Sequence, residues 1–281
     1  MAKVGLIAGI GILPVEFMRA AHLLGHEVVV IGVVPDIDPA LEREADAFYS
    51  IGVAKLGKIF KTLKKEGVVE LTMLGKVTKE ILFNGLSFPD LKTLGGVLRR
   101  LKNRKDDTIM LAIVDEVERE GFKVLDQTVY LKPFMPKVGG VLSQTSPTDE
   151  QWEDICFGFE LAKQMGALDI GQTVVVKHKA AMAIEAIEGT DKCILRGGEL
   201  GRGDAVVVKT EKPNQDVRFD VPAVGIKTLM SMIDSGCKVL AVEAEKTIFV
   251  QQQEVLDMAN RHNIVICAVN EDFVNARKDA R

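Results

Sequence analysis

Residues 4–33 carry the sequence VGLIAGIGILPVEFMRAAHLLGHEVVVIGV, in which two apolar runs flank a helical pattern. The runs Val4–Ala8 and Val28–Val33 are of the length and composition that buried parallel strands have. A glycine-rich turn follows the first run, and Pro14 stands near the start of the helical pattern, where proline is favoured. This order of strand, glycine turn, helix and strand predicts a Rossmann-like, doubly wound α/β domain.

The glycine turn also limits the choice of ligand. The dinucleotide fingerprint G-x-G-x-x-G requires a third glycine, and Pro14 stands at that position. Asp36 follows the second apolar run only after a proline, so the acidic residue that would bind a ribose is also missing. We therefore disfavour a nicotinamide-dependent oxidoreductase. Gly9 and Gly11 can still bring backbone N–H groups close to a ligand, although a tight turn without a ligand is the other interpretation.

The α/β alternation continues beyond this opening. An amphipathic helix over 55–66 leads to a strand over 69–74, and Lys76 follows at its carboxyl end, where open α/β sheets bind ligands. Lys76 is thus either a phosphate contact or an exposed loop lysine. A helix over 91–101 leads into the basic run Arg99–Lys105, which is either a solvated helix end or a contact with an anionic membrane surface.

A domain boundary is predicted near residue 133. Pro133, Pro136, Gly139 and Gly140 fall within eight residues, a density of prolines and glycines that marks a linker. We expect a Rossmann-like domain over 1–132 and a catalytic α/β domain of non-standard topology over 133–281. The expected elements of the second domain include a capping box, Thr148 with Gln151, and a hairpin-like pair of strands near His178.

Composition excludes several classes of protein. The chain has 281 residues, 47% of them apolar and 27% charged, which is typical of globular domains. The formal net charge of −4 argues against a nucleic-acid partner. No apolar run reaches the length of a membrane span. The four cysteines and four histidines show no metal-ligand spacing, and the cysteines fit a reducing cytoplasm. Cys193, Cys237 and Cys267 stand in apolar surroundings and are expected to pack as small hydrophobes.

A charged loop framed by prolines, Lys212–Gly225, has the residue types needed for chemistry on a phosphorylated substrate. Asp216 and Asp220 suit a hard divalent cation, and Lys212 and Arg218 suit phosphate oxygens. A solvated surface connection is the other interpretation.

The segment Glu188-Gly189-Thr190-Asp191 is a second cluster of polar residues. Its carboxylates suit a metal ion or a ribose. Alternatively, Thr190 or Asp191 caps the short helix that follows.

Several motifs resemble those of a known family. They are Gly5-Leu6-Ile7-Ala8-Gly9, Gly75-Lys76-Val77, Glu118-Arg119-Glu120-Gly121-Phe122, Leu168-Asp169-Ile170-Gly171-Gln172, Glu185-Ala186-Ile187-Glu188-Gly189-Thr190-Asp191 and Lys212-Pro213-Asn214-Gln215-Asp216-Val217-Arg218-Phe219-Asp220-Val221-Pro222. On these motifs the chain resembles, nearly from end to end, the UDP-2,3-diacylglucosamine pyrophosphatases of the lipid A pathway.

This resemblance implies an activity and a mode of binding. The family hydrolyses UDP-2,3-diacylglucosamine to UMP and 2,3-diacylglucosamine 1-phosphate (lipid X), uses Mg²⁺, holds the glycolipid between two domains and tends to form homodimers. Its essential aspartate falls on Asp220. Water attacks the phosphorus on the sugar side, and UMP leaves.

The chemistry of the residues agrees, because cleaving a pyrophosphate requires neutralised oxygens and an aligned water. The expected catalytic residues are Asp220, Asp216 and Arg218. The expected metal ligands are Asp220, Asp216 and Asp191. The expected substrate-binding residues are Gly9, Gly11, Lys76, Lys177, Glu188, Gly189, Thr190, Lys209, Lys212 and Gln215. Glu245 stands where relatives more often have glycine, which leaves the role of Glu243 open.

The lipid substrate leads to expectations about the binding surface and the location of the protein in the cell. The acyl chains require an apolar surface rich in Leu, Ile, Phe and Met, and the substrate implies a cytoplasmic protein with peripheral contact at the inner membrane. The alternative function is a non-catalytic protein that binds or senses a nucleotide-linked glycolipid.

Overall fold

Residues 2–77 and 106–279 are described by a computed structural model, and the chain divides into two units. Unit 1 comprises Met1–Leu131 and Val217–Phe219, and unit 2 comprises Lys132–Asp216 and Asp220–Arg281. The helix expected over 91–101 and the basic run Arg99–Lys105 lie outside the described residues. No helix within the described ranges is both long enough and apolar enough to cross a membrane.

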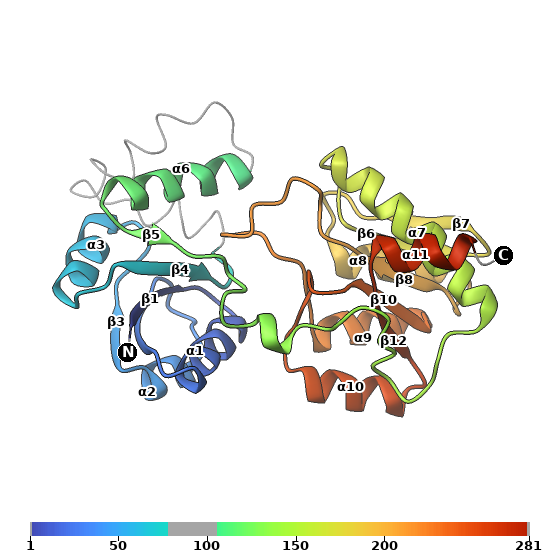
Figure 1. The fold of residues 1–281 in the computed structure, drawn as a ribbon, viewed down its shortest axis with the longest axis horizontal. Helices are drawn as coiled ribbons and strands as arrows, with labels where there is room; N and C mark the ends of the chain where they lie inside the picture. Colours follow the sequence, from blue (N-terminus) through green and yellow to red (C-terminus); the bar gives the residue numbers. More distant parts are fainter. Residues whose placement is uncertain (1, 78–105, 280–281) are drawn as a thin grey trace. The chain divides into compact units, whose positions relative to one another are not determined.

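Unit 1 is built on a five-stranded sheet in the order β3-β2-β1-β4-β5, and every neighbouring pair is parallel (Figure 1). The strands are β1 Lys3–Ala8, β2 Glu27–Gly32, β3 Ala47–Ser50, β4 Glu70–Leu74 and β5 Lys123–Val124. The helices are α1 Leu13–Leu23, α2 Pro39–Glu44, α3 Leu56–Lys65 and α6 Asp106–Arg119. This arrangement confirms the predicted Rossmann-like fold.

Hydrophobic periodicity explains why these helices form where they do. In α3 the buried residues Leu56, Ile59, Phe60 and Leu63 follow the helical period and join the core cluster that includes Leu71 of β4. Because α6 packs into the same cluster, α3 and α6 cover one face of the sheet, while α1 and α2 cover the other (Figure 1). The carboxyl ends of β1 and β4 are in register, since Ala8 pairs with Leu74.

Unit 2 is built on a mixed five-stranded sheet in the order β12-β10-β8-β6-β7. Strands β8, β10 and β12 are parallel, whereas β6 is antiparallel to both β8 and β7. The strands of this sheet are β6 Thr173–Lys177, β7 Ala180–Ile184, β8 Val206–Lys209, β10 Val239–Glu243 and β12 Val265–Val269. The predicted hairpin and the expected non-standard topology are therefore confirmed.

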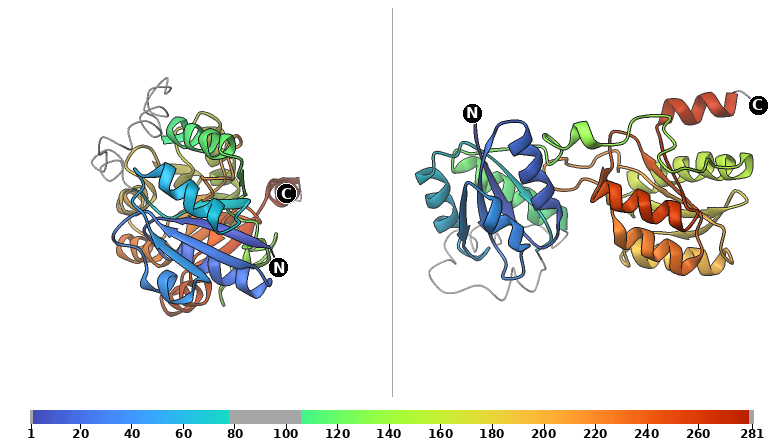
Figure 2. Two further views of the ribbon diagram at one scale, coloured as in Figure 1. Left: turned by 90° about the vertical axis from the view of Figure 1, so that its left-hand side faces the viewer. Right: turned by 90° about the horizontal axis from the view of Figure 1, so that it is seen from below.

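Helices cover both faces of this second sheet (Figures 1 and 2). Buried residues of α7 Asp149–Ala167 and α11 Glu271–Asp279 share one core cluster with the sheet. Those of α8 Thr190–Leu200, α9 Ile226–Ser235 and α10 Gln252–Arg261 share another. A small sheet of β9 Ala223–Val224 and β11 Ile248–Phe249 and a 3-10 turn, η2 Lys132–Phe134, complete the unit.

The structure shows which residues cap two of the helices and whether the cysteines are buried. The capping box of Thr148 and Gln151 at the start of α7 is confirmed. The expectation that Thr190 or Asp191 caps α8 is wrong, because Gly189 is the N-cap and no side chain among the described residues caps this helix. Cys193, Cys237 and Cys267 are buried, as expected, and Cys156 is buried as well. Burial raises the pKa of Cys193 and Cys267 to about 12.

Candidate functional site

Several charged residues of unit 2 stand at one edge of its sheet. Lys209 ends β8 and Glu243 ends β10, two neighbouring parallel strands. Thr173, the first residue of the antiparallel strand β6, pairs with Lys209, and Glu185 directly follows β7. These residues therefore share the carboxyl-terminal edge of the parallel strands, where α/β sheets bind ligands.

Lys209 is the centre of this group. It is only 6% exposed, and its Nζ donates to the Thr190 hydroxyl oxygen at 3.2 Å and to the Ala223 carbonyl oxygen at 2.9 Å. Burial lowers the pKa of Lys209, while the negative charges of Glu185, Asp191 and Asp220 act in the opposite direction. A buried ammonium group with acidic residues around it is a physical reason to look for function at this place.

Glu185 is the functional candidate that sequence reasoning missed. It is 8% exposed, and its Oε1 accepts a hydrogen bond of 2.9 Å from the Thr190 hydroxyl. Its Oε2 is buried and has no hydrogen-bond partner among the described residues. The backbone here is closely packed, because a Cβ atom at Gly171 would lie 2.2 Å from the Glu185 carbonyl oxygen. The available sequence signal was an acidic residue directly after an apolar strand.

The charged loop contributes a second part of the site. The Asp220 backbone N–H donates to the Asp216 carbonyl oxygen at 3.0 Å, so the two aspartates stand at the ends of one turn. The Asp220 side chain is 35% exposed, and its Oδ2 lies 3.9 Å from Lys212 Nζ. Lys212 Nζ also contacts Asp169 at 3.0 Å, and the Lys212 backbone N–H donates to Gln215 Oε1 at 2.8 Å. Lys212, Gln215, Asp216 and Asp220 are thus gathered in unit 2.

Lys177 and Glu188, two of the predicted substrate-binding residues, form hydrogen bonds with other residues of unit 2. Lys177 stands at the opposite end of β6 from Thr173, and its Nζ donates to the carbonyl oxygens of Gly201 and Gly203, each at 2.9 Å. Glu188 is bound by Arg196 at 2.6 Å, which lowers the pKa of Glu188.

Arg218 belongs to unit 1, where its Nη1 donates to Glu118 Oε1 at 3.0 Å. Within unit 2, Lys177 lies at the opposite end of the sheet from Lys209. Glu243, whose role the sequence left open, receives Lys163 Nζ on both carboxylate oxygens at 3.0 Å.

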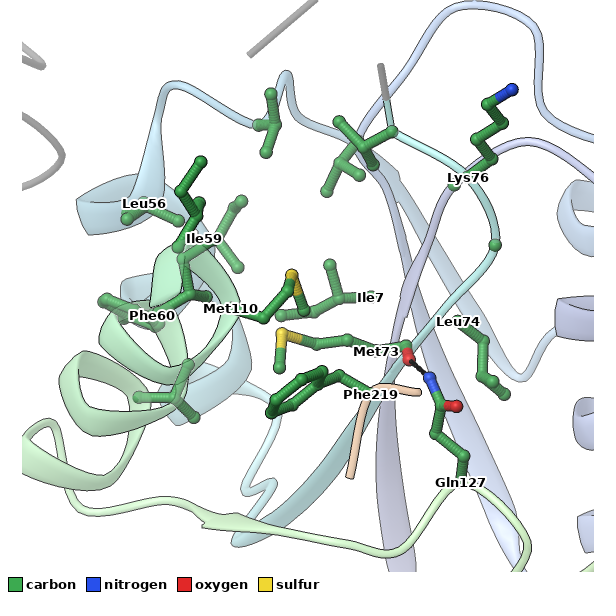
Figure 3. A pocket seen from close by; sticks show the side chains of 18 residues that line it. Ile7, Leu56, Ile59, Phe60, Met73, Leu74, Lys76, Met110, Gln127 and Phe219 are labelled. Carbon is green, nitrogen blue, oxygen red and sulfur yellow. Dashed lines mark hydrogen bonds between the residues drawn. The ribbon is translucent and has the colours of Figure 1, made fainter. Parts of the chain in front are cut away.

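The glycine turn of unit 1 has a structural explanation. A Cβ atom at Gly9 would lie 2.7 Å from the Lys76 carbonyl oxygen, and Ile10 and Lys76 exchange backbone hydrogen bonds of 2.8 and 2.9 Å. Gly11 has φ of 118°, a conformation that glycine adopts readily. The turn after β1 is therefore fastened to the end of β4. The Lys76 side chain is exposed and points away from Met73 (Figure 3).

Unit 1 also contains an apolar cavity of about 290 Å³. The residues lining it come from the sheet, from α3 and α6, and from the loop segment 217–219 (Figure 3). They include Ile7, Ile59, Phe60, Met73, Met110, Ile113 and Phe219. Polar groups are few, and the amide of Gln127 is already bound to the Met73 carbonyl oxygen at 2.6 Å. Such a cavity fits a hydrocarbon chain.

The fold places this chain among the α/β proteins, a class whose sheets commonly bind ligands beyond the carboxyl ends of their strands. Models described as the LpxI N-terminal domain and the LpxI C-terminal domain match residues 3–134 and 138–267. The chain belongs to the LpxI family, which confirms the resemblance drawn from its motifs.

A relative in this family is named as an enzyme. The UDP-2,3-diacylglucosamine pyrophosphatase LpxI of Caulobacter vibrioides is 32% identical over 282 residues, covering 96% of this chain and 98% of that protein.

Likeness to solved structures is more remote. A UDP-glucose-4-epimerase from Stenotrophomonas maltophilia has a TM-score of 0.31 and 12% identity, covering 53% of this chain and 40% of that one. The UDP-glucose 4-epimerase of Thermotoga maritima has a TM-score of 0.29 and 10% identity, covering 53% and 42%. These values are too low to bear on function.

Proposed function

We propose that this protein hydrolyses the pyrophosphate bond of UDP-2,3-diacylglucosamine, releasing UMP and 2,3-diacylglucosamine 1-phosphate (lipid X). The observation that carries the proposal is the match, over 96% of the chain, to a protein named as the pyrophosphatase for this substrate. The charged edge of unit 2 supports it, because a buried lysine and nearby carboxylates suit a reaction at a diphosphate.

The proposed reaction assigns roles to Lys209 and to three residues of the charged loop. A water oxygen bonds to the sugar-side phosphorus, the bond from that phosphorus to the bridging oxygen breaks, and UMP leaves with the bridging oxygen. Asp220 orients the water and accepts its proton, with Asp216 at the other end of the same turn. Lys209 and Lys212 neutralise the phosphate oxygens, whose negative charge shifts during the reaction.

The proposal includes Mg²⁺, and the residues present fit it. Among residues 2–77 and 106–279 no group of three or more histidines, cysteines or acidic residues forms a ready-made metal site. Magnesium needs only one or two carboxylates when substrate phosphates and waters complete its coordination. Asp220, Asp216 and Asp191 would hold it, and the unpartnered Glu185 Oε2 is a further oxygen of the type that it prefers. When bound, the ion would neutralise charge on the phosphate oxygens.

The apolar cavity of unit 1 supports the lipid part of the proposal. We assign one acyl chain of the substrate to it, because Leu, Ile, Phe and Met side chains dominate its lining. Binding cavities for small molecules commonly have volumes of about 300–1,000 Å³, and this cavity lies near the lower end.

Turnover by purified protein tests the function. We expect UMP release from UDP-2,3-diacylglucosamine with Mg²⁺ present, and loss of turnover by at least about a hundredfold in Asp220→Ala, since general acid–base groups contribute on this scale. Asp234→Ala, which removes an exposed carboxylate from α9, is the matched control and should retain its rate.

Two other outcomes would change the assignment. Near-normal rates in Asp220→Ala would transfer the catalytic role to Asp216 or Asp191. Tight binding of the substrate by the unaltered protein without any UMP release would support the non-catalytic binding protein instead.

The proposal also includes a homodimer and peripheral contact with the inner membrane, both of which follow from the resemblance and the lipid substrate. Sedimentation velocity measures the first, and cosedimentation with anionic vesicles measures the second. A monomer at micromolar concentration would contradict the homodimer. Absence of vesicle binding at low salt would contradict the membrane contact.

A further inference from the structure

Three consecutive residues of the charged loop belong to a different unit from the residues on either side. Val217, Arg218 and Phe219 are part of unit 1, whereas Asp216 and Asp220 are part of unit 2. Each of the three residues is fastened to unit 1 in its own way. The Val217 carbonyl oxygen accepts from the Gln127 backbone N–H at 2.9 Å. Arg218 Nη1 donates to Glu118 Oε1 at 3.0 Å, and the Phe219 side chain packs against the apolar core.

Phe219 is also part of the cavity wall. Its ring lies beside Met73, with Met110 nearby, and faces the space that we assign to an acyl chain (Figure 3). Gln127 connects this wall to the loop, because its side chain donates to the Met73 carbonyl oxygen at 2.6 Å while its backbone N–H donates to Val217. Gln127 is 7% exposed, so water has little access to the donors and acceptors of these two hydrogen bonds. A chain that fills the cavity therefore contacts a residue whose position is tied to the loop.

We propose that Phe219 is a positioning residue that couples occupancy of the cavity by an acyl chain to the placement of Asp220. The proposal rests on the proposed function and adds how the lipid part of the substrate affects catalysis. Asp220 is the next residue, with its Cα about 3.8 Å away along a planar peptide bond, so a displaced Phe219 backbone displaces Asp220 as well. The hydrogen bond from Asp220 N–H to the Asp216 carbonyl oxygen makes residues 216–220 one turn, so both aspartates respond together.

The expected size of the effect follows from the geometry that catalysis requires. Misplacing a catalytic group by about 1 Å can reduce a rate by about a hundredfold. Binding energy from a remote part of a substrate raises kcat when it is used to orient the reacting groups, and substrates without that part then lose kcat. A residue that only lines the cavity would instead contribute to binding alone, which changes KM and leaves kcat intact.

Steady-state kinetics with two substrates distinguish these cases. UMP release is measured with UDP-2,3-diacylglucosamine carrying long acyl chains and with an analogue carrying two acetyl groups, for the unaltered protein, Phe219→Ala and Phe219→Leu. We expect the unaltered protein to show a kcat at least about tenfold lower with the short-chain analogue. In Phe219→Ala, kcat with the long-chain substrate should fall toward that of the analogue, and Phe219→Leu should restore part of it.

Met110→Ala is the matched control, because Met110 lines the same cavity from α6 and is not part of the loop. It should raise KM for the long-chain substrate and preserve the ratio of kcat values between the two substrates. Thermal unfolding of each variant checks its fold, and Phe219→Leu carries the test if Phe219→Ala does not fold.

Two results would overturn the coupling. One is a Phe219→Ala variant, or a Phe219→Leu variant in its place, that raises KM while the kcat ratio of the two substrates stays as in the unaltered protein. The other is an unaltered protein whose kcat does not depend on acyl-chain length. Failure of the proposed function looks different, because the unaltered protein would then release no UMP from either substrate.

Discussion

Lys209 is the residue of unit 2 whose environment most clearly requires explanation. An ammonium group loses favourable hydration when it is buried, and this loss is compensated only by hydrogen bonds and opposite charges. Thr190 and Ala223 provide two acceptors, and three carboxylates provide negative charge. An apolar residue at the end of β8 would avoid the desolvation cost altogether. The proposed function supplies a reason for a lysine at this position, because its charge would neutralise phosphate oxygens of the substrate.

The lowered pKa of Lys209 predicts the pH dependence of activity. The protonated form neutralises phosphate, so kcat/KM should fall as pH rises through the folded-state pKa, which lies below the ordinary value of 10.5. Lys209→Arg should move this alkaline limb upward, because a guanidinium group remains protonated. A pH–rate profile of both proteins measures the limb, and an unchanged limb in Lys209→Arg would assign it to another group.

The same shift affects stability in the opposite sense. Because the unfolded chain keeps the Lys209 proton to higher pH than the folded chain, the free energy of unfolding should rise with pH between the two pKa values. Stability and activity should therefore change in opposite directions on the alkaline side, which separates the loss of a catalytic charge from unfolding.

Among the elements, helix α8 positions Thr190, its first residue, at the polar edge of the unit 2 sheet. It can approach its neighbours closely because two glycines face them. A Cβ atom at Gly197 would lie 2.4 Å from Val175 Cβ of β6, and one at Gly198 would lie 2.4 Å from Ser235 Cβ of α9. This close packing fixes α8 over the sheet and so fixes Thr190, which contacts both Glu185 and Lys209.

Gly197→Ala should destabilise the protein in spite of the higher helix propensity of alanine. The propensity gain is at most about 1 kcal/mol, whereas overpacking a close contact costs about 1–3 kcal/mol. The matched control is Gly52→Ala, whose Cβ meets no described atom within 4 Å. Urea unfolding measures both variants, and equal or greater stability of Gly197→Ala would contradict the close packing of α8 on β6.

At the scale of the whole molecule, each unit has its own hydrophobic core. Leu63 of α3 belongs to the core of unit 1, and Leu240 of β10 belongs to a core cluster of unit 2. Both are fully buried. A chain with separate cores need not unfold in a single step, so its calorimetric and van't Hoff enthalpies need not agree.

Leu63→Ala and Leu240→Ala are a matched pair that tests this separation. Each should cost about 2–5 kcal/mol, the usual range for a buried leucine. In scanning calorimetry we expect each variant to lower the temperature of a different transition. One common transition, lowered equally by both substitutions, would show that the units unfold together.

The sequence by itself determined the fold class, most of the elements and the family. Apolar periodicity, glycines, prolines and caps act on the backbone within a few residues, so α3, the hairpin of β6 and β7 and the capping box of α7 could be predicted locally. The motifs identified the family for a different reason, since they preserve residue types at fixed spacing.

Only the tertiary structure decided which side chains meet. The sequence predicted that Lys177 and Arg218 contact the diphosphate. Only the strand register shows that Lys177 lies at the end of β6 away from Lys209, and only the folded chain shows that Arg218 pairs with Glu118. Sequence reasoning also missed the buried Glu185 oxygen and the position of Phe219 in the cavity wall. The physical reason is that contacts between residues far apart in the chain depend on register and packing, which no local pattern of residues encodes.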